Sequence, residues 1–119
     1  MKNLAPQIFR QRLLVEGYTN AAVSREMLAA TMTGLAARLG LRAYAAPVIF
    51  SPGDAGRPEN QGFDAFLPLV DSGIAVYYWS GARFVSVLMF TCKAFDETQA
   101  IDFLREAFDI EGEIASTSI

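Results

Sequence analysis

The sequence predicts an α+β fold, a two-layer sandwich in which an antiparallel sheet carries two helices on one face. Strand-like and helical patterns follow in the order strand, helix, strand, loop, strand, strand, strand, helix, tail, so several strands are neighbours in sequence. The chain has 119 residues, and 52% of them are hydrophobic. This length suffices for one core and is short for two, so we expect one domain over residues 1–119.

The first half of the chain predicts a strand, a helix and a second strand. Large apolar residues with partial alternation place the first strand between Gln7 and Gly17. Thr19 and Asn20 supply helix-starting side chains. An apolar stripe with spacings of four, three and four then predicts the helix: Leu28, Met32, Leu35 and Leu39. Gly40 is expected to cap its C-terminus.

The middle of the chain predicts further strands around a long loop. A strand pattern covers Leu41–Phe50, and residues 51–62, SPGDAGRPENQG, form a loop without a bulky apolar side chain. Extended segments are expected at Phe63–Val70, Gly73–Trp79 and Arg83–Lys93 because β-branched and aromatic residues are frequent there.

The C-terminal part predicts the second helix. Asp96 and Gln99 have the spacing of a capping box, with an apolar Phe95 ahead of them. The buried side of this helix is predicted to hold Ile101, Leu104 and Phe108. The tail, EIASTSI, either adds a short edge strand or stays loose.

A sheet with helices on one face leaves its other face open. The strands between residues 74 and 90 are aromatic and apolar, so we expect a partner to cover that face. The simplest arrangement is a homodimer formed by two stacked sheets.

Composition excludes several classes of function. The net charge is −3 and the ten Lys and Arg residues are scattered, so there is no basic stripe for nucleic acid or an anionic membrane. A single cysteine and no histidine exclude an internal disulfide and a cysteine-built zinc site, and we expect no metal. No signal peptide and no stretch of about 20 apolar residues are seen, so we expect a soluble, cytoplasmic protein.

Residues 72–92, SGIAVYYWSGARFVSVLMFTC, form the most distinctive segment. An acidic residue and a serine, Asp71-Ser72, begin a strand that ends at Trp79, and the next strand finishes in Phe-Thr-Cys at Cys92. This arrangement resembles the core of the small prokaryotic S-adenosylmethionine decarboxylases. The upstream run RLLVEGY, which contains Glu16, resembles the first strand of that family.

The resemblance implies a self-processing, pyruvoyl-dependent enzyme. In that family the serine becomes a pyruvoyl group at the start of a new fragment, and its carbonyl condenses with the substrate amine and serves as an electron sink for loss of carbon dioxide. Ser72 would then be the pyruvoyl precursor, Asp71 the last residue of the released fragment, and Cys92 the acid that protonates the product. No other cofactor is expected.

The chain departs from the family pattern at residues that carry the chemistry. The family has a histidine where this chain has Gly73, and another, used in self-processing, where it has Tyr77. A serine that assists the ester step is matched by Asp64, and a Pro-Glu pair by Ser80-Gly81. A phenol is a poor general base at neutral pH without strong help, whereas a carboxylate at position 64 could in principle transfer a proton.

Several of these residues also have a simpler interpretation. Ser72 fits a strand-entry serine that hydrogen-bonds locally, and Cys92 fits a small buried apolar residue. Trp79 and Tyr77 fit core or interface aromatics, although the family's adenine-bearing substrate lies near that tryptophan and a base could stack here.

The acidic candidates have simpler interpretations as well. Asp71 and Asp64 fit turn and loop carboxylates. Glu16 is either an exposed strand residue or a neighbour of the ligand site.

Three functions stay open. The first is a divergent decarboxylase relative that remains intact and binds a related ligand or regulates an active paralogue as its partner subunit. The second is an active pyruvoyl-dependent carboxy-lyase of polyamine biosynthesis, acting on S-adenosylmethionine or on a basic amino acid such as arginine or ornithine. The third is a small-molecule-sensing dimer unrelated to decarboxylation, an interpretation that rests on the fold alone.

Overall fold

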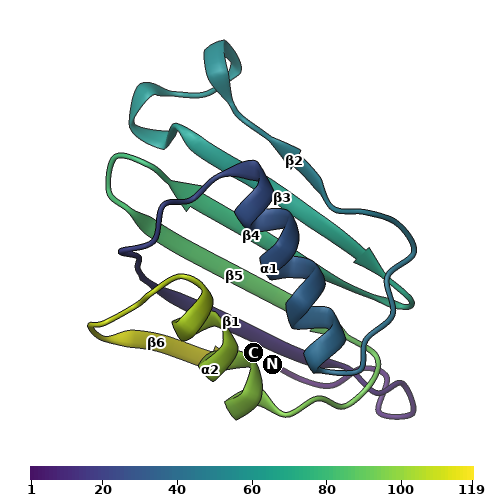
Figure 1. Cartoon of the computed structure of the whole chain (residues 1–119). Helices are drawn as coiled ribbons and strands as arrows, with labels where there is room; N and C mark the ends of the chain where they lie inside the picture. The colour runs from purple at the N-terminus through teal and green to yellow at the C-terminus, as the bar shows by residue number, and fades with distance from the viewer.

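A six-stranded sheet forms one layer of the molecule and two helices form the other (Figure 1). A computed structural model describes all residues, Met1–Ile119. Every strand pair is antiparallel, in the order β2-β3-β4-β5-β1-β6. The predicted α+β class with helices on one face is confirmed.

The elements are β1 (Gln11–Tyr18), α1 (Arg25–Arg38), β2 (Val48–Phe50), the 3₁₀ turns η1 (Gly53–Ala55) and η2 (Pro58–Asn60), β3 (Gly62–Leu69), β4 (Ser72–Trp79), β5 (Phe84–Thr91), α2 (Glu97–Ala107) and β6 (Ile114–Ser118).

Helix α1 begins later than the sequence predicts. Its N-cap is Ser24, whose side chain accepts a hydrogen bond from the Met27 amide at 3.1 Å. Thr19 is buried, and its hydroxyl donates to the carbonyl of Phe108 and accepts from the Ala21 amide at 3.0 Å, so it is not free to start a helix. The predicted end at Gly40 is confirmed: Gly40 has φ of 70°, and the Leu41 amide donates to the Ala36 carbonyl at 2.8 Å, as in a Schellman cap.

The strand predicted over Leu41–Phe50 is mostly wrong, because only its last three residues form β2. The segment before β2 approaches the sheet at single points, with the Tyr44 amide donating to the Pro68 carbonyl at 3.0 Å. Pro47 has no amide hydrogen to donate, and the two alanines before it have low strand propensity, so a regular ladder does not form there.

The C-terminal elements follow the sequence pattern. Asp96 caps α2 by accepting a hydrogen bond from the Gln99 amide at 3.2 Å. Leu104 and Phe108 are fully buried, whereas Ile101 is half-buried. The tail forms the edge strand β6, paired with β1, and the Ser118 hydroxyl donates to the Glu97 carboxylate at 2.7 Å.

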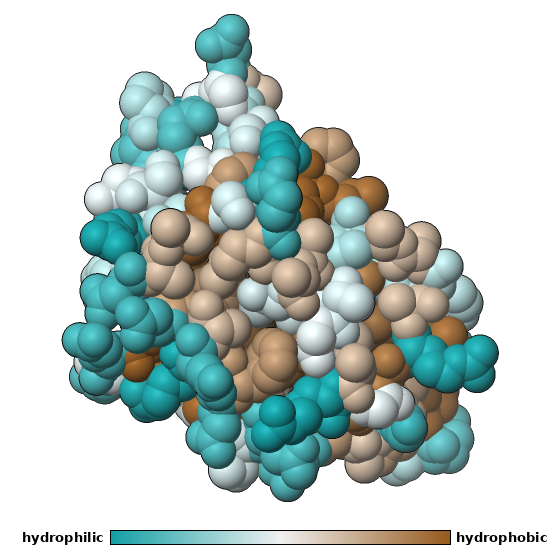
Figure 2. All heavy atoms as spheres, in the orientation of Figure 1, coloured by the Kyte–Doolittle hydropathy of each residue, from teal (hydrophilic) through white to brown (hydrophobic).

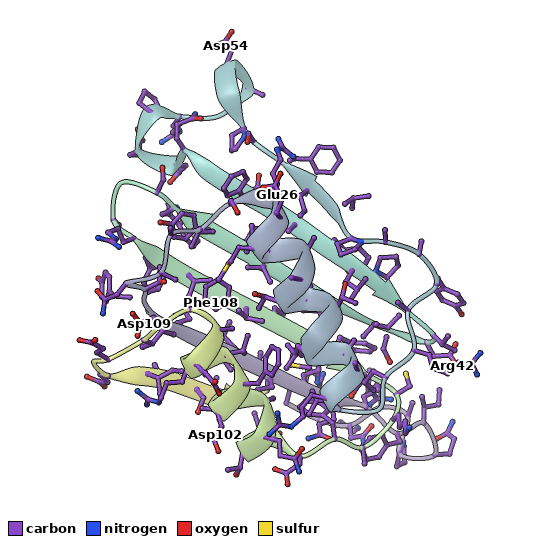
Figure 3. The ribbon with its side chains drawn as sticks, in the orientation of Figure 1. Glu26, Arg42, Asp54, Asp102, Phe108 and Asp109 are labelled. Atoms are coloured by element: carbon purple, nitrogen blue, oxygen red, sulfur yellow. The ribbon has the colours of Figure 1, made fainter.

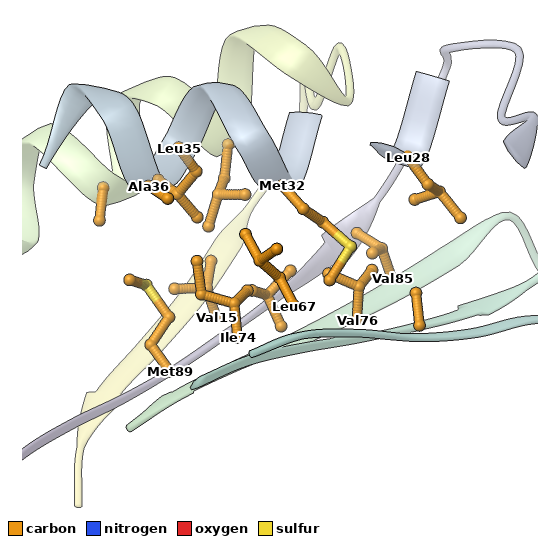
Figure 4. Close-up of a cluster of buried hydrophobic side chains, with 14 of the residues drawn as sticks. Val15, Leu28, Met32, Leu35, Ala36, Leu67, Ile74, Val76, Val85 and Met89 are labelled. Carbon is orange, nitrogen blue, oxygen red and sulfur yellow. The ribbon is translucent and has the colours of Figure 1, made fainter. Parts of the chain in front are cut away.

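One hydrophobic core fills the space between helices and sheet. Leu28, Met32 and Leu35 of α1 point down onto Ile74 of β4 and Val87 of β5, and all five side chains are at most 1% exposed (Figure 4 labels four of them). Because this core uses one face of every long strand, the alternate residues of the same strands lie on the opposite face.

That opposite face, called the open face below, carries large apolar side chains without cover from this chain. Its exposed members include Phe66 (45%), Tyr77 (42%), Leu88 (40%) and Phe90 (41%). Arg12 lies beside Phe90 on this face, and its Nε is buried without a hydrogen-bond partner. On the helix-covered side, Figure 2 shows apolar atoms reaching the surface chiefly over the β2 edge.

Neither helix has the length and apolar character that crossing a bilayer requires.

Candidate functional site

The turn between β3 and β4 presents Ser72 at the first position of β4. Asp71 occupies the turn with φ of 56°, a left-handed conformation that aspartate tolerates better than most residues. The Ser72 hydroxyl oxygen accepts a hydrogen bond from the Cys92 amide at 3.1 Å. The structure therefore brings Asp71, Ser72 and Cys92 together, which we call the serine cluster.

Cys92 is exposed rather than buried, so its interpretation as a small core residue is wrong. It lies just beyond the end of β5, beside Lys93, whose Nζ donates to the Gly40 carbonyl at 2.9 Å. A cavity of about 210 Å³ here is also lined by Arg42 and Asp71. Cys92 is thus exposed, and it lies at the same end of the paired strands β4 and β5 as Ser72.

Gly73 stands at the position of the missing histidine and provides no side chain beside Ser72. The ring of Phe66 covers this glycine, so that a Cβ at position 73 would lie 2.8 Å from two ring carbons. A cavity of about 300 Å³ lies on the open face beside Ser72, and apart from Ser72 and Asp71 its lining residues are apolar. No carboxylate other than Asp71, and no other base, lines it.

Tyr77, Asp64 and Glu16 lie in one row across the open face. Tyr77 of β4 pairs with Asp64 of β3 on one side and with Ser86 of β5 on the other, and Ser86 pairs with Glu16 of β1. The Ser86 hydroxyl donates to the Glu16 carboxylate at 2.8 Å. Four polar residues therefore lie side by side on four adjacent strands of this face. Asp64 is a strand residue rather than a loop carboxylate.

Trp79 ends β4 under the loop of residues 51–61. Its indole Nε1 donates to the Asn60 side-chain oxygen at 3.0 Å, and its ring packs against Phe84 with 5.5 Å between centroids. A cavity of about 390 Å³ lies between the sheet and this loop, and we call it the loop cavity. Asp64, Tyr77 and Trp79 line it from the sheet, and Arg57 and Asn60 line it from the loop. This volume is in the range of small-molecule sites.

The predicted site residues thus form two separate groups in one chain. Tyr77 lies five positions after Ser72 in β4, which corresponds to about 17 Å along an extended strand. Tyr77 and Asp64 pair with each other, so both are far from the Ser72 hydroxyl. Within one chain, neither can act on Ser72 directly. Glu16 lies in the polar row but does not line the loop cavity.

Sequence reasoning missed Arg57, Asn60 and Ser86. The loop at residues 51–62 was recognised, but its composition does not reveal that it folds back over β4. Strand alternation in β5 could have placed Ser86 beside Tyr77, because both residues face the same side in the observed register.

The precursor of the pyruvoyl group that the resemblance implies, Ser72, is present, whereas Gly73, Tyr77 and Asp64 stand at the positions of the family's two histidines and its assisting serine. The nearest partner of the Ser72 hydroxyl is a backbone amide, and the expected assisting groups lie at the other end of the strand. No group of three or more Cys, Asp or Glu side chains is arranged to hold a metal ion.

Comparison with known proteins connects this geometry to one family. The S-adenosylmethionine decarboxylase family model matches residues 11–117. The crystal structure of the adenosylmethionine decarboxylase from Aquifex aeolicus VF5 has a similar fold, with a TM-score of 0.74 and 14% sequence identity, over 94% of this chain and 89% of that chain. At this identity the likeness bears on the fold alone. The comparison with curated proteins gave no match.

Proposed function

Since the chain belongs to the S-adenosylmethionine decarboxylase family, we propose that it works as an intact chain that binds a small molecule related to the family's substrate. In this proposal Ser72 stays a serine and no pyruvoyl group forms. The loop cavity over Tyr77 and Trp79 is the binding site, with a ring of the ligand stacked on the indole.

The separation of the serine cluster from the loop cavity carries this proposal. The Ser72 hydroxyl is bonded to a backbone amide, and Phe66 fills the space beside Gly73. The loop cavity, by contrast, offers an aromatic ring, a phenol, a carboxylate and a guanidinium around one space of ligand size.

Titration with adenosine tests the binding proposal. Adenosine is expected to stabilise the protein, by about 2.7 kcal/mol at 100 times its dissociation constant. Trp79→Ala is expected to abolish this stabilisation, whereas Tyr44→Ala, which removes an exposed aromatic residue outside the cavity, keeps it. Trp79 is the only tryptophan, so intrinsic fluorescence reports directly on the site. Equal stabilisation of both variants would contradict the proposal.

We further propose that a second chain covers the open face, either a second copy or a paralogous subunit that this chain regulates. The exposed apolar residues of β3, β4 and β5 support this, because such a face is costly to leave in water. The single cysteine is consistent with residence in the cytoplasm.

The backbone at Asp71 favours an alternative, an active pyruvoyl-dependent decarboxylase. Asp71, which adopts a left-handed conformation that costs a non-glycine residue roughly 1 kcal/mol, lies immediately before the peptide bond that self-processing would break. Assisting groups would then have to come from the covering chain. Release of carbon dioxide from S-adenosylmethionine, arginine or ornithine by folded protein would establish this alternative, and its absence for all three would remove it.

A further inference from the structure

The loop of residues 51–61 forms one side of the loop cavity, and its conformation is fixed by hydrogen bonds. The Gln61 side chain holds it from inside: its Oε1 accepts from the Gly53 amide at 3.1 Å, and its Nε2 donates to the Gly53 carbonyl at 2.9 Å and the Arg57 carbonyl at 3.2 Å. The loop is tied to the sheet where the Ser80 amide donates to the Gln61 carbonyl at 2.9 Å. The loop is therefore positioned before any ligand arrives.

Arg57 is the one charged residue of this loop that lines the cavity. Asp54 and Glu59 do not line it, and Figure 3 shows Asp54 at the tip of the loop pointing away from the sheet. Hydrogen bonds of the Gln61 and Asn60 side chains hold the loop in place. The Arg57 guanidinium takes no part in these bonds, so ligand binding does not have to break them. Asp64 lies on the opposite wall, in the sheet.

We infer that Arg57 is a specificity-determining residue that selects ring-bearing ligands with an anionic group, a carboxylate or a phosphate. A guanidinium binds either anion through two parallel hydrogen bonds. The Asp64 carboxylate repels an anion placed over the sheet, so the anionic group is held on the loop side while the ring lies against Trp79. This inference rests on the binding site of the proposed function and adds the class of ligand that it accepts.

Calorimetric titration of the intact protein with three probes tests the inference. Adenosine carries the ring alone, adenosine monophosphate adds a phosphate, and S-adenosylmethionine adds a carboxylate together with an ammonium and a sulfonium. At least one probe that carries an anionic group is expected to bind about tenfold more tightly than adenosine. Arg57→Gln should remove this preference, and Arg57→Lys should retain part of it.

Arg38→Gln is the matched control. It removes the same charge from the exposed last turn of α1, and it should preserve the preference because that turn is outside the cavity. Adenosine binding without a preference for either anionic probe, or a preference that survives Arg57→Gln, overturns this inference and leaves the proposed function intact. If none of the probes binds, both fail.

Discussion

Gly62, the first residue of β3, allows the chain to pass from the loop of residues 51–61 into the strand. Its φ is 153°, and a Cβ there would lie 1.8 Å from the carbonyl oxygen of Tyr78, a backbone atom that cannot move aside. Only glycine allows β3 to run this close to the end of β4. The loop cavity therefore depends on a position that carries no side chain.

Replacing Gly62 tests this dependence. Gly62→Ala is expected to lower the free energy of unfolding by about 2 kcal/mol or more, because both the dihedral angle and the contact with Tyr78 oppose a side chain. Gly112→Ala is the control, since nothing lies within 4 Å of a Cβ there, and it should change stability by less than about 0.5 kcal/mol. Urea denaturation measures both, and equal effects would show that the close approach is not needed.

Single residues also show how far sequence reasoning reaches. The resemblance carried by Ser72, Trp79 and Cys92 is confirmed at the level of the family, and the order of strands follows the pattern. The separation of Ser72 and Trp79 is predictable, because a strand that begins at one and ends at the other holds them at its two ends, whereas the position of the loop over Trp79 is not. The exposure of Cys92 depends on where β5 ends, which a small residue does not signal.

At the scale of elements, local chemistry is predictable when it uses neighbours in sequence. The caps at Gly40 and Asp96 were predicted because their partners lie within a few residues. Thr19 was assigned wrongly because its partner, the Phe108 carbonyl, lies 89 residues away in sequence. The loop at residues 51–61 is a similar case, since contacts with β4 decide its position.

The cap of α2 gives a quantitative prediction at this scale. Asp96→Ala removes the side chain that accepts from the Gln99 amide, and it should destabilise the protein by about 1 kcal/mol. Asp102→Ala removes the same charge from the exposed side of the same helix, seen pointing outward in Figure 3, and should cost less than about 0.5 kcal/mol. Thermal unfolding of the two variants provides the comparison, and similar values would argue against a capping role.

For the whole molecule, we propose that the open face is the dimer interface. Leu88→Lys places a charge in the centre of that face and should convert a dimer into a monomer of near 13.0 kDa. Ala30→Lys adds the same charge to the outer side of α1 and should leave the dimer intact. Light scattering at micromolar concentration distinguishes the two masses. A wild-type monomer would mean that the open face is not covered by a second copy.

The intact mass of freshly purified protein under denaturing conditions tests the central claim most directly. The proposed function predicts a single species near 13.0 kDa, because the positions of the family's two histidines hold Gly73 and Tyr77. Two fragments separated between Asp71 and Ser72, the second with a pyruvoyl terminus, would contradict the account and establish self-processing without the family's histidines.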